Sequence, residues 1–286
     1  MSKGILLFAQ NNHSVDYIKQ AIFCAKKIKK HLGLPVALAT DNPNYLEQKY
    51  PYYKKYIEHV ITQEWYECAQ KRTYRDGTMS NRDLEWRNHN RSTAYNITPF
   101  EETIVMDTDF IIGNDILLNA FDTDQEFLIY RHITDLNMDR PDEYRFNKIS
   151  DRSVDMYWAT VFYFKKTEGM KFFFDLVSHI KENWSYYRLI YQIPRRTFRN
   201  DFAFSIAIHI INGFQRTNWP KVLPGRLWFT SDSDVLIKMD DENYTFLLDK
   251  KNWEGHYHIG TAKDVNIHVM NKFSLDRAIS EVLANE

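Results

Sequence analysis

Apolar residues gather in short runs that alternate with polar stretches near the start of the chain. Residues 4–9 form a continuous apolar run bounded by polar residues 10–13, which predicts a buried strand that ends in a loop. Apolar positions then recur at helical spacing over residues 15–28, and a second apolar run follows at 35–39. Strand, helix and strand in this order predict a βαβ unit, which binds ligands at the carboxyl ends of its strands.

The next third of the chain has a weaker pattern. Residues 44–82 are rich in Tyr and charged side chains, and we expect helix and loop there. Asp83 can cap a helix over residues 83–95, because a carboxylate accepts hydrogen bonds from the free amides of a helix start. A third buried strand is predicted at residues 103–106 and is followed directly by Asp107-Thr108-Asp109.

The remaining pattern predicts a strand at 156–164, helices at 168–183 and 201–211, strands near 227–229, 244–248 and 266–270, and a last helix at 275–283. No repeat, low-complexity tract or linker marks a second domain. We therefore expect one α/β domain over residues 1–286, with a mixed, mostly parallel sheet flanked by helices.

Three Asp-x-Asp triplets occur, at residues 107–109, 122–124 and 232–234. Only the first directly follows a buried apolar run, which places two carboxylates at the carboxyl end of a central strand. The other two look like surface turns. Two carboxylates suit Mg²⁺ or Mn²⁺, and such an ion can bridge the two phosphates of a nucleotide-sugar and stabilise the departing diphosphate. The alternative is a solvated turn after the strand.

The stretch from Arg91 to Asp109, Arg-Ser-Thr-Ala-Tyr-Asn-Ile-Thr-Pro-Phe-Glu-Glu-Thr-Ile-Val-Met-Asp-Thr-Asp, resembles the helix, loop, strand and Asp-x-Asp motif of GT-A glycosyltransferases, especially the glycogenin and galactosyltransferase-like relatives. Most of the chain fits that pattern. The resemblance implies a metal-dependent hexosyl- or pentosyltransferase with a UDP-sugar as the favoured donor. It also implies a Rossmann-like nucleotide-sugar-binding half at residues 1–115 and an acceptor-binding half at residues 116–286.

The resemblance also implies donor-site residues in the first half. Nucleotide binding falls on the end of the first strand and on the acidic residue after the second, namely Ala9, Gln10, Asn11, Asn12 and Asp41. Arg91 matches a basic residue that touches the donor, and Asp107 belongs to both the donor site and the metal site.

Late in the chain, His268 in Ile-x-His matches the histidine that completes the metal site with Asp107 and Asp109. A hydrogen-bonded core histidine is the alternative. The family pattern continues with Gly and Lys-Pro-Trp, whereas here Asn271 and Lys272 follow and no Pro-Trp appears. Lys272 is the expected contact to the diphosphate.

Asn200-Asp201 opens the predicted helix at 201–211 and resembles a pair that relatives use near the acceptor. A carboxylate there can act as general base towards an acceptor hydroxyl if the enzyme inverts, or orient the sugar if it retains. A helix cap is the alternative interpretation of the same pair.

The formal net charge of −1 gives no general reason for binding nucleic acid or acidic lipid. Between Tyr186 and Arg226, however, seven basic residues stand against one acidic residue, Asp201, and aromatic residues are interleaved with them. Arg195, Arg196 and Arg199 in this stretch are candidate contacts to an anionic acceptor. The acceptor can be a glycan, a protein or a hydroxymethylated base in bacteriophage DNA; the alternative is a solvated face paired with acidic residues 232–242.

Only Cys24 and Cys68 are present, which gives no disulfide framework. The first apolar run is too short for a signal peptide, and no segment approaches a membrane span. We expect a cytoplasmic enzyme without a membrane partner, in the host cytoplasm if it is viral. Two other classes stay open: a nucleotidyltransferase that makes sugar nucleotides, although no Gly-rich phosphate loop follows the first strand, and a non-catalytic nucleic-acid or carbohydrate-binding protein on the same scaffold.

Overall fold

The computed structural model describes residues 2–64, 70–86, 90–138, 147–150, 154–194, 197–240, 242–250 and 256–284. Its largest sheet has the strand order β3-β2-β1-β6-β10-β8. The strands are β1 (Lys3–Ala9), β2 (Val36–Thr40), β3 (His59–Thr62), β6 (Glu102–Met106), β8 (Phe127–Tyr130) and β10 (Trp158–Lys165). Neighbours among β3, β2, β1 and β6 are parallel, and β10 is antiparallel to both of its neighbours. The prediction of an α/β fold with a mixed, mostly parallel sheet flanked by helices is confirmed.

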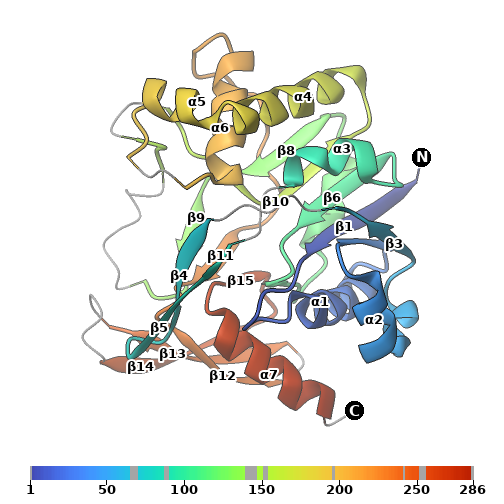
Figure 1. Ribbon diagram of the computed structural model, residues 1–286, viewed down its shortest axis with the longest axis vertical. Helices are drawn as coiled ribbons and strands as arrows, with labels where there is room; N and C mark the ends of the chain where they lie inside the picture. The colour runs from blue at the N-terminus through green and yellow to red at the C-terminus, as the bar shows by residue number, and fades with distance from the viewer. Residues whose placement is uncertain are drawn as a thin grey trace.

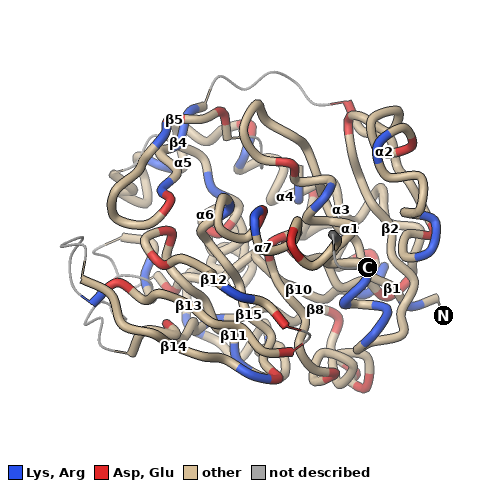
Figure 2. Tube along the Cα trace, turned by 90° about the horizontal axis from the view of Figure 1, so that it is seen from below, with Lys and Arg blue, Asp and Glu red and all other residues tan. Residues whose placement is uncertain are grey.

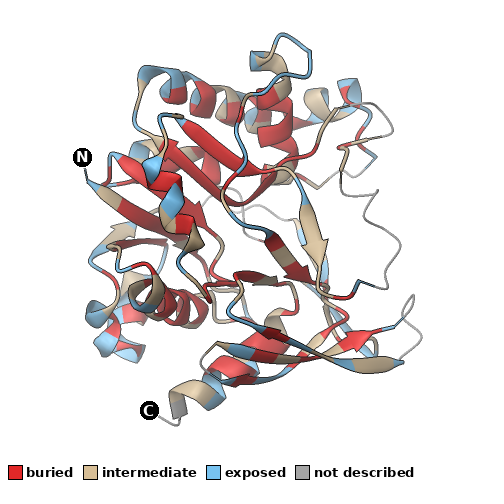
Figure 3. Cartoon of the chain, turned by 180° about the vertical axis from the view of Figure 1, so that it is seen from behind, coloured by how far each residue is buried: buried red, intermediate tan, exposed pale blue. Residues whose placement is uncertain are grey.

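Helices cover both faces of this sheet (Figure 1). Helix α1 (Tyr17–His31) lies on one face, and α4 (Glu168–Glu182) and α6 (Asn200–Ile211) lie on the other, with α5 (Trp184–Ile190) beside them. Aromatic rings from the sheet and these helices interlock: the ring centroids of Phe162 and Phe204 are 4.9 Å apart. Buried residues accordingly concentrate on the sheet and the inner helix faces (Figure 3). Most aromatic side chains thus serve the core, where each buries a large apolar area.

Two smaller sheets come mainly from the last third of the chain. One has the order β7-β15-β11-β9, formed by Phe110–Ile111, Ile267–Val269, Leu227–Thr230 and Ile133–Asp135. The other contains β12 (Val235–Asp240), β13 (Asn243–Asp249) and β14 (Tyr257–Lys263), and α7 (Lys272–Ala284) packs against β12. Because β15 pairs with β7, the end of the chain returns to the segment that follows β6.

The helix predicted over residues 83–95 is wrong. Residues 83–85 belong to β5 (Ser80–Glu85), which forms a hairpin with β4 (Lys71–Asp76). In the described parts of this stretch, 83–86 and 90–95, helical turns begin only at Arg91, with Arg91–Thr93 and α3 (Ala94–Ile97). Gly77, in the hairpin loop, has a φ of +72°, a conformation that glycine adopts at no steric cost. Asp83 does not cap a helix, because its carboxylate accepts a hydrogen bond from Thr73 Oγ1 across the hairpin at 2.6 Å.

The stretch from 44 to 82, expected as helix and loop, also contains β3 and β4. Its helical parts are α2 (Pro43–Lys49) and the 3-10 helix Pro51–Lys55, and another 3-10 helix spans Ile116–Asp122. Among the described helices, none is long and apolar enough to cross a membrane. Cys24 is a buried free thiol, and Cys68 lies outside the described residues.

Candidate functional site

Asp107 and Asp109 lie where the central sheet ends. Strand β6 is buried throughout and stops at Met106, and β7 starts at Phe110. The amide of Asp107 donates to the carbonyl of Thr160 in β10 at 2.9 Å, and the amide of Phe110 donates to the carbonyl of Asp107 at 3.1 Å. The two carboxylates therefore occupy a tight turn at the carboxyl edge of the parallel strands, where α/β sheets bind ligands.

His268 is brought to this turn by strand pairing. It lies opposite Phe110 in the β15–β7 register, and the amide of Val269 donates to the carbonyl of Asp109 at 3.0 Å. The imidazole Nε2 is 3.2 Å from Asp109 Oδ2. One ligand atom from each of Asp107, Asp109 and His268 lies within 4.8 Å of the other two. Two carboxylates and an imidazole in such a group can hold a divalent metal ion.

Each of the two carboxylates also has a cationic partner. Arg91 forms an ion pair with Asp107 and donates to the backbone carbonyl of Ala159. Lys272 forms an ion pair with Asp109 and donates to the carbonyl of Val269 at 3.2 Å. Burial lowers the pKa of Arg91 to about 10 and holds the pKa of Lys272 well below its usual range. These pairs compensate the carboxylate charges at a site where Arg91 and Asp109 are buried.

The ends of β1 and β2 are joined by Gln10 and Asp41. Gln10 Nε2 donates to Asp41 Oδ2 at 2.9 Å, which fixes the orientation of the amide because a carboxylate only accepts. Gln10 Oε1 is buried and has no hydrogen-bond partner among the described residues. Of the five residues predicted for nucleotide binding at these two strand ends, Gln10 and Asn12 line the central pocket, whereas Ala9, Asn11 and Asp41 are not among its lining residues.

Asn11 and Asn12 organise the turn into α1. Asn11 accepts from the amide of Ile18 at 3.0 Å and donates to Asp16, the N-cap residue of the helix. Asn12 Oδ1 accepts from the amides of Ser14 and Val15. Their side chains thus stabilise the loop after β1, as polar residues at helix starts do.

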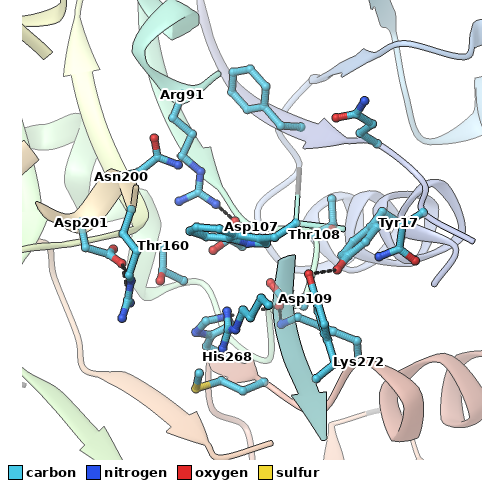
Figure 4. A pocket seen from close by; sticks show the side chains of 18 of the residues that line it. Tyr17, Arg91, Asp107, Thr108, Asp109, Thr160, Asn200, Asp201, His268 and Lys272 are labelled. Carbon is cyan, nitrogen blue, oxygen red and sulfur yellow. Dashed lines mark hydrogen bonds and ion pairs between the residues drawn. The ribbon is translucent and has the colours of Figure 1, made fainter. Parts of the chain in front are cut away.

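Asp201 stands in the first turn of α6, on the pocket wall. Its Oδ1 accepts from the amide of Ala159 at 2.9 Å, and its Oδ2 accepts from Arg199 Nη2 at 2.6 Å. Figure 4 shows Asn200 and Asp201 on one side of Asp107 and Tyr17 on the other. Arg199 therefore also reaches the pocket, while Arg195 and Arg196 lie outside the described residues.

These side chains line one pocket, which opens to solvent and has a cavity volume of about 110 Å³. Its charged residues are four basic and four acidic: Arg72, Arg91, Arg199 and Lys272, with Glu85, Asp107, Asp109 and Asp201. Sequence reasoning missed part of the wall, above all residues of α1, the hairpin and the start of β10: Tyr17, Arg72, Tyr74, Glu85, Trp86 and Trp158. The Asp76-Gly77 pair was the available signal, because Asp-Gly marks hairpin turns.

The other two Asp-x-Asp triplets lie elsewhere. Asp122 and Asp124 are exposed, as expected of a surface turn. Residues 232–234 do form a turn, but Asp234 is only 1% exposed, so the expectation that this turn lies on the surface is wrong for Asp234. Its carboxylate accepts from the amides of Ser231 at 2.8 Å and Asp249 at 2.9 Å. Asp234 therefore ties β11 to β13 by satisfying two backbone amides.

The basic stretch between residues 186 and 226 is partly neutralised within the fold. Arg199 pairs with Asp201, and Arg216 lies 3.6 Å from Asp155. Figure 2 shows basic and acidic residues distributed over the whole chain. The acidic partners found here are not the predicted ones at 232–242.

Among known proteins, the chain matches only solved structures, and it matches them by fold. No protein-family model matches the chain. No curated protein matches it either. Similar solved structures include the glycosyltransferase GlyE of Streptococcus pneumoniae, with a TM-score of 0.43 and 12% identity over 74% of this chain and 43% of GlyE. The chain thus spans less than half the length of GlyE.

Two other similar structures are also glycosyltransferases. Galactosyltransferase LgtC, in complex with donor and acceptor sugar analogs, has a TM-score of 0.44 and 12% identity over 71% of this chain and 69% of LgtC. Mouse xyloside xylosyltransferase 1 has a TM-score of 0.45 and 12% identity over 75% of this chain and 83% of that enzyme.

Proposed function

We propose that this protein is a metal-dependent glycosyltransferase that moves a sugar from a nucleotide-diphosphate sugar, with a UDP-sugar favoured, to an acceptor hydroxyl. The convergence of Asp107, Asp109 and His268 at the carboxyl edge of the central sheet carries the proposal. This edge is where α/β folds bind nucleotides, and the three side chains line the pocket there.

The two carboxylates and the imidazole of Asp107, Asp109 and His268 are suitable ligands for Mn²⁺ or Mg²⁺. Four basic and four acidic side chains balance each other in the pocket. A divalent cation therefore leaves an excess of positive charge, which complements an anionic diphosphate. When bound, the ion supplies Lewis-acid stabilisation of the charge that grows on the departing diphosphate.

The residues around the end of β1 support a nucleotide with a ring N–H donor. Gln10 Oε1 is a buried acceptor with no partner among the described residues, and Gln10 lines the pocket. An unsatisfied buried acceptor is costly, so a ligand N–H that reaches it gains affinity. Uracil has one such ring N–H. Tyr17 and Trp86 also line the pocket and offer aromatic faces for the base or the sugar.

We assign the donor nucleotide to residues 1–115 and the acceptor to residues 116–286, with His268 and Lys272 reaching back from the second half to the metal and the diphosphate. Asp201 faces the reacting sugar or the acceptor, either as a general base or as an orienting carboxylate. Arg199, with Arg195 and Arg196, is assigned to the acceptor side. A glycan, a protein or a hydroxymethylated DNA base meets these requirements.

A panel of donors tests the proposal. Purified protein is incubated with UDP-, GDP-, CMP- and TDP-sugars and Mn²⁺, and release of free nucleotide is measured. We expect release from one donor, loss of release with EDTA, and loss in the Asp107→Asn/Asp109→Asn variant. The exposed Asp122→Asn/Asp124→Asn variant is the matched control and should keep full release. No release together with no Mn²⁺-dependent nucleotide binding would contradict the proposal.

A further inference from the structure

Arg72 reaches the pocket from the hairpin, an element that the chain inserts between β3 and α3. Residues of a strand alternate between its two faces. On β4 the inward positions include Arg72 and Tyr74, both of which line the pocket, whereas Lys71 and Thr73 are exposed. Arg72 stays close to its own strand, with its guanidinium carbon 5.7 Å from the centre of the Tyr74 ring.

The hairpin is anchored to the same C-terminal segment that carries Lys272. Asp76 forms two hydrogen bonds with Arg277 of α7, at 2.7 and 2.8 Å. At the tip, the amide of Thr78 donates to the hydroxyl of Tyr257 at 2.8 Å. A β-carbon on Gly77 would come within 2.9 Å of that same hydroxyl. These contacts fix β4 relative to the metal-site residues, so the position of Arg72 is built into the fold.

The pairing of Arg72 differs from that of the other basic residues in the pocket. Arg91 pairs with Asp107, Lys272 with Asp109 and Arg199 with Asp201. Among the described residues, no carboxylate lies at ion-pair distance from Arg72, although the charge of Arg72 acts on the pKa of Asp232, which burial raises, and lowers it. A guanidinium that is not held in a direct ion pair can turn its donors to an anionic ligand in the pocket.

Arg72 and Lys272 line the same pocket, Arg72 from β4 and Lys272 from the start of α7. Two neighbouring cations repel each other. An anion that lies between them is attracted by both, and these two contacts outweigh the repulsion.

We infer that Arg72 binds the diphosphate of the nucleotide donor, together with Lys272, from the hairpin side of the pocket. This assignment rests on the proposed function, since it requires a nucleoside diphosphate in this pocket. Arginine suits the task because its planar fork can donate two parallel hydrogen bonds to phosphate oxygens.

Calorimetric titration of the whole chain with UDP and with uridine, both in Mn²⁺, tests the inference. Arg72→Gln should weaken UDP binding by about ten-fold or more, the loss expected of one charge-assisted contact. Uridine affinity should stay within about two-fold, and Arg72→Lys should recover part of the UDP affinity. Lys71→Gln removes the same charge from an exposed position on the same strand and should leave both affinities unchanged.

The outcomes separate the inference from the function on which it rests. Wild-type protein that binds UDP, with Arg72→Gln binding it equally well, overturns the role of Arg72 and leaves the proposed function intact. Equal losses of UDP and uridine in Arg72→Gln also overturn it, because they indicate a disturbed pocket; thermal unfolding of each variant identifies that case. Wild-type protein that binds no nucleoside diphosphate contradicts the proposed function itself.

Discussion

The carboxylate of Asp201 accepts a hydrogen bond from the backbone amide of Ala159, with 2.9 Å between Oδ1 and the nitrogen. The carbonyl of Ala159 in turn accepts from Arg91, which pairs with Asp107. One peptide segment of β10 therefore connects α6 to the carboxylates of the metal site. Any change at Asp201 has two separable consequences, one for charge in the pocket and one for the position of β10.

Asp201→Asn separates these two consequences. Asparagine keeps an oxygen for the Ala159 amide but loses the charge that pairs with Arg199. We expect the rate of donor hydrolysis or transfer to fall by about 10²-fold or more, the range for loss of a general base, with UDP affinity within about three-fold. Asp201→Ala should also lower the free energy of unfolding by about 1–3 kcal/mol, because it leaves the backbone amide of Ala159 without its hydrogen-bond acceptor. Rate measurements test the expected loss of activity, and urea unfolding tests the expected loss of stability. An Asp201→Asn variant that keeps the wild-type rate would show that Asp201 takes no part in the chemistry.

Lys272→Met should move metal and nucleotide affinity in opposite directions. Lys272 pairs with Asp109 and so competes with a cation for that carboxylate. Its removal should strengthen Mn²⁺ binding without nucleotide by about ten-fold, the effect of a nearby like charge. UDP affinity should fall, since a cation beside the diphosphate is lost. Mn²⁺ titration with and without UDP measures both; a parallel loss of the two affinities would show that Lys272 acts through structure.

Arg91→Lys should damage the site although it conserves charge. The guanidinium serves Asp107 and the Ala159 carbonyl at once, whereas an ammonium lacks the rigid fork needed for both. We expect donor hydrolysis to fall by at least about ten-fold and the free energy of unfolding to fall by about 1–3 kcal/mol. Activity assays and urea unfolding provide the test. Unchanged stability would mean that the pair with Asp107 is dispensable.

The buried parallel strands and the candidate metal site could be predicted from sequence because they depend on short-range patterns. Continuous apolar runs identify β1, β2 and β6, since a strand buried on both faces has no polar positions to interrupt it. The polar residues that follow these runs must then lie at one edge of the sheet, and this places Asp107 and Asp109 correctly. His268 could also be predicted from sequence, because it lies in an apolar strand. Its distance from Asp109, however, depends on the β15–β7 pairing.

The hairpin and its contribution to the pocket were not predicted, because its strands lack a clean alternation. Polar and charged residues occupy both faces of β4 and β5, and Arg72 points towards a polar pocket rather than a core. Asp83 looked like a helix cap because sequence alone does not show that Thr73 lies opposite it. Asp234 was misjudged for a similar reason: its partner Asp249 is distant in sequence.

The three Asp-x-Asp triplets should respond differently to mutation. Asp234→Ala removes the acceptor of two backbone amides, one of them buried, and should lower the free energy of unfolding by about 2 kcal/mol. Asp124→Ala, at an exposed position, should change it by less than about 0.5 kcal/mol. Neither should alter Mn²⁺ affinity, whereas Asp109→Ala should abolish it. Urea unfolding and Mn²⁺ titration distinguish the three, and a loss of metal affinity in Asp234→Ala would contradict the site assignment.

Anchoring of the hairpin should depend on pH through Asp76. Hydrogen bonds from Arg277 hold the pKa of Asp76 below its ordinary value of 3.8. A carboxyl with a lowered folded-state pKa adds stability that is complete above the unfolded pKa and is lost as pH falls through the folded value. Asp76→Asn should therefore cost about 1 kcal/mol at pH 7, a modest figure because Arg277 is half exposed.

The difference between wild type and Asp76→Asn should shrink below about pH 4, where the carboxyl in the unfolded chain begins to protonate, and should approach zero once the folded carboxyl is protonated. Urea unfolding from pH 7 to pH 3 measures this difference directly. In an Arg277→Gln background, Asp76→Asn should show much less pH dependence, since the group that lowers the pKa is absent. A difference that stays constant with pH in the wild-type background would show that the pair with Arg277 does not anchor the hairpin.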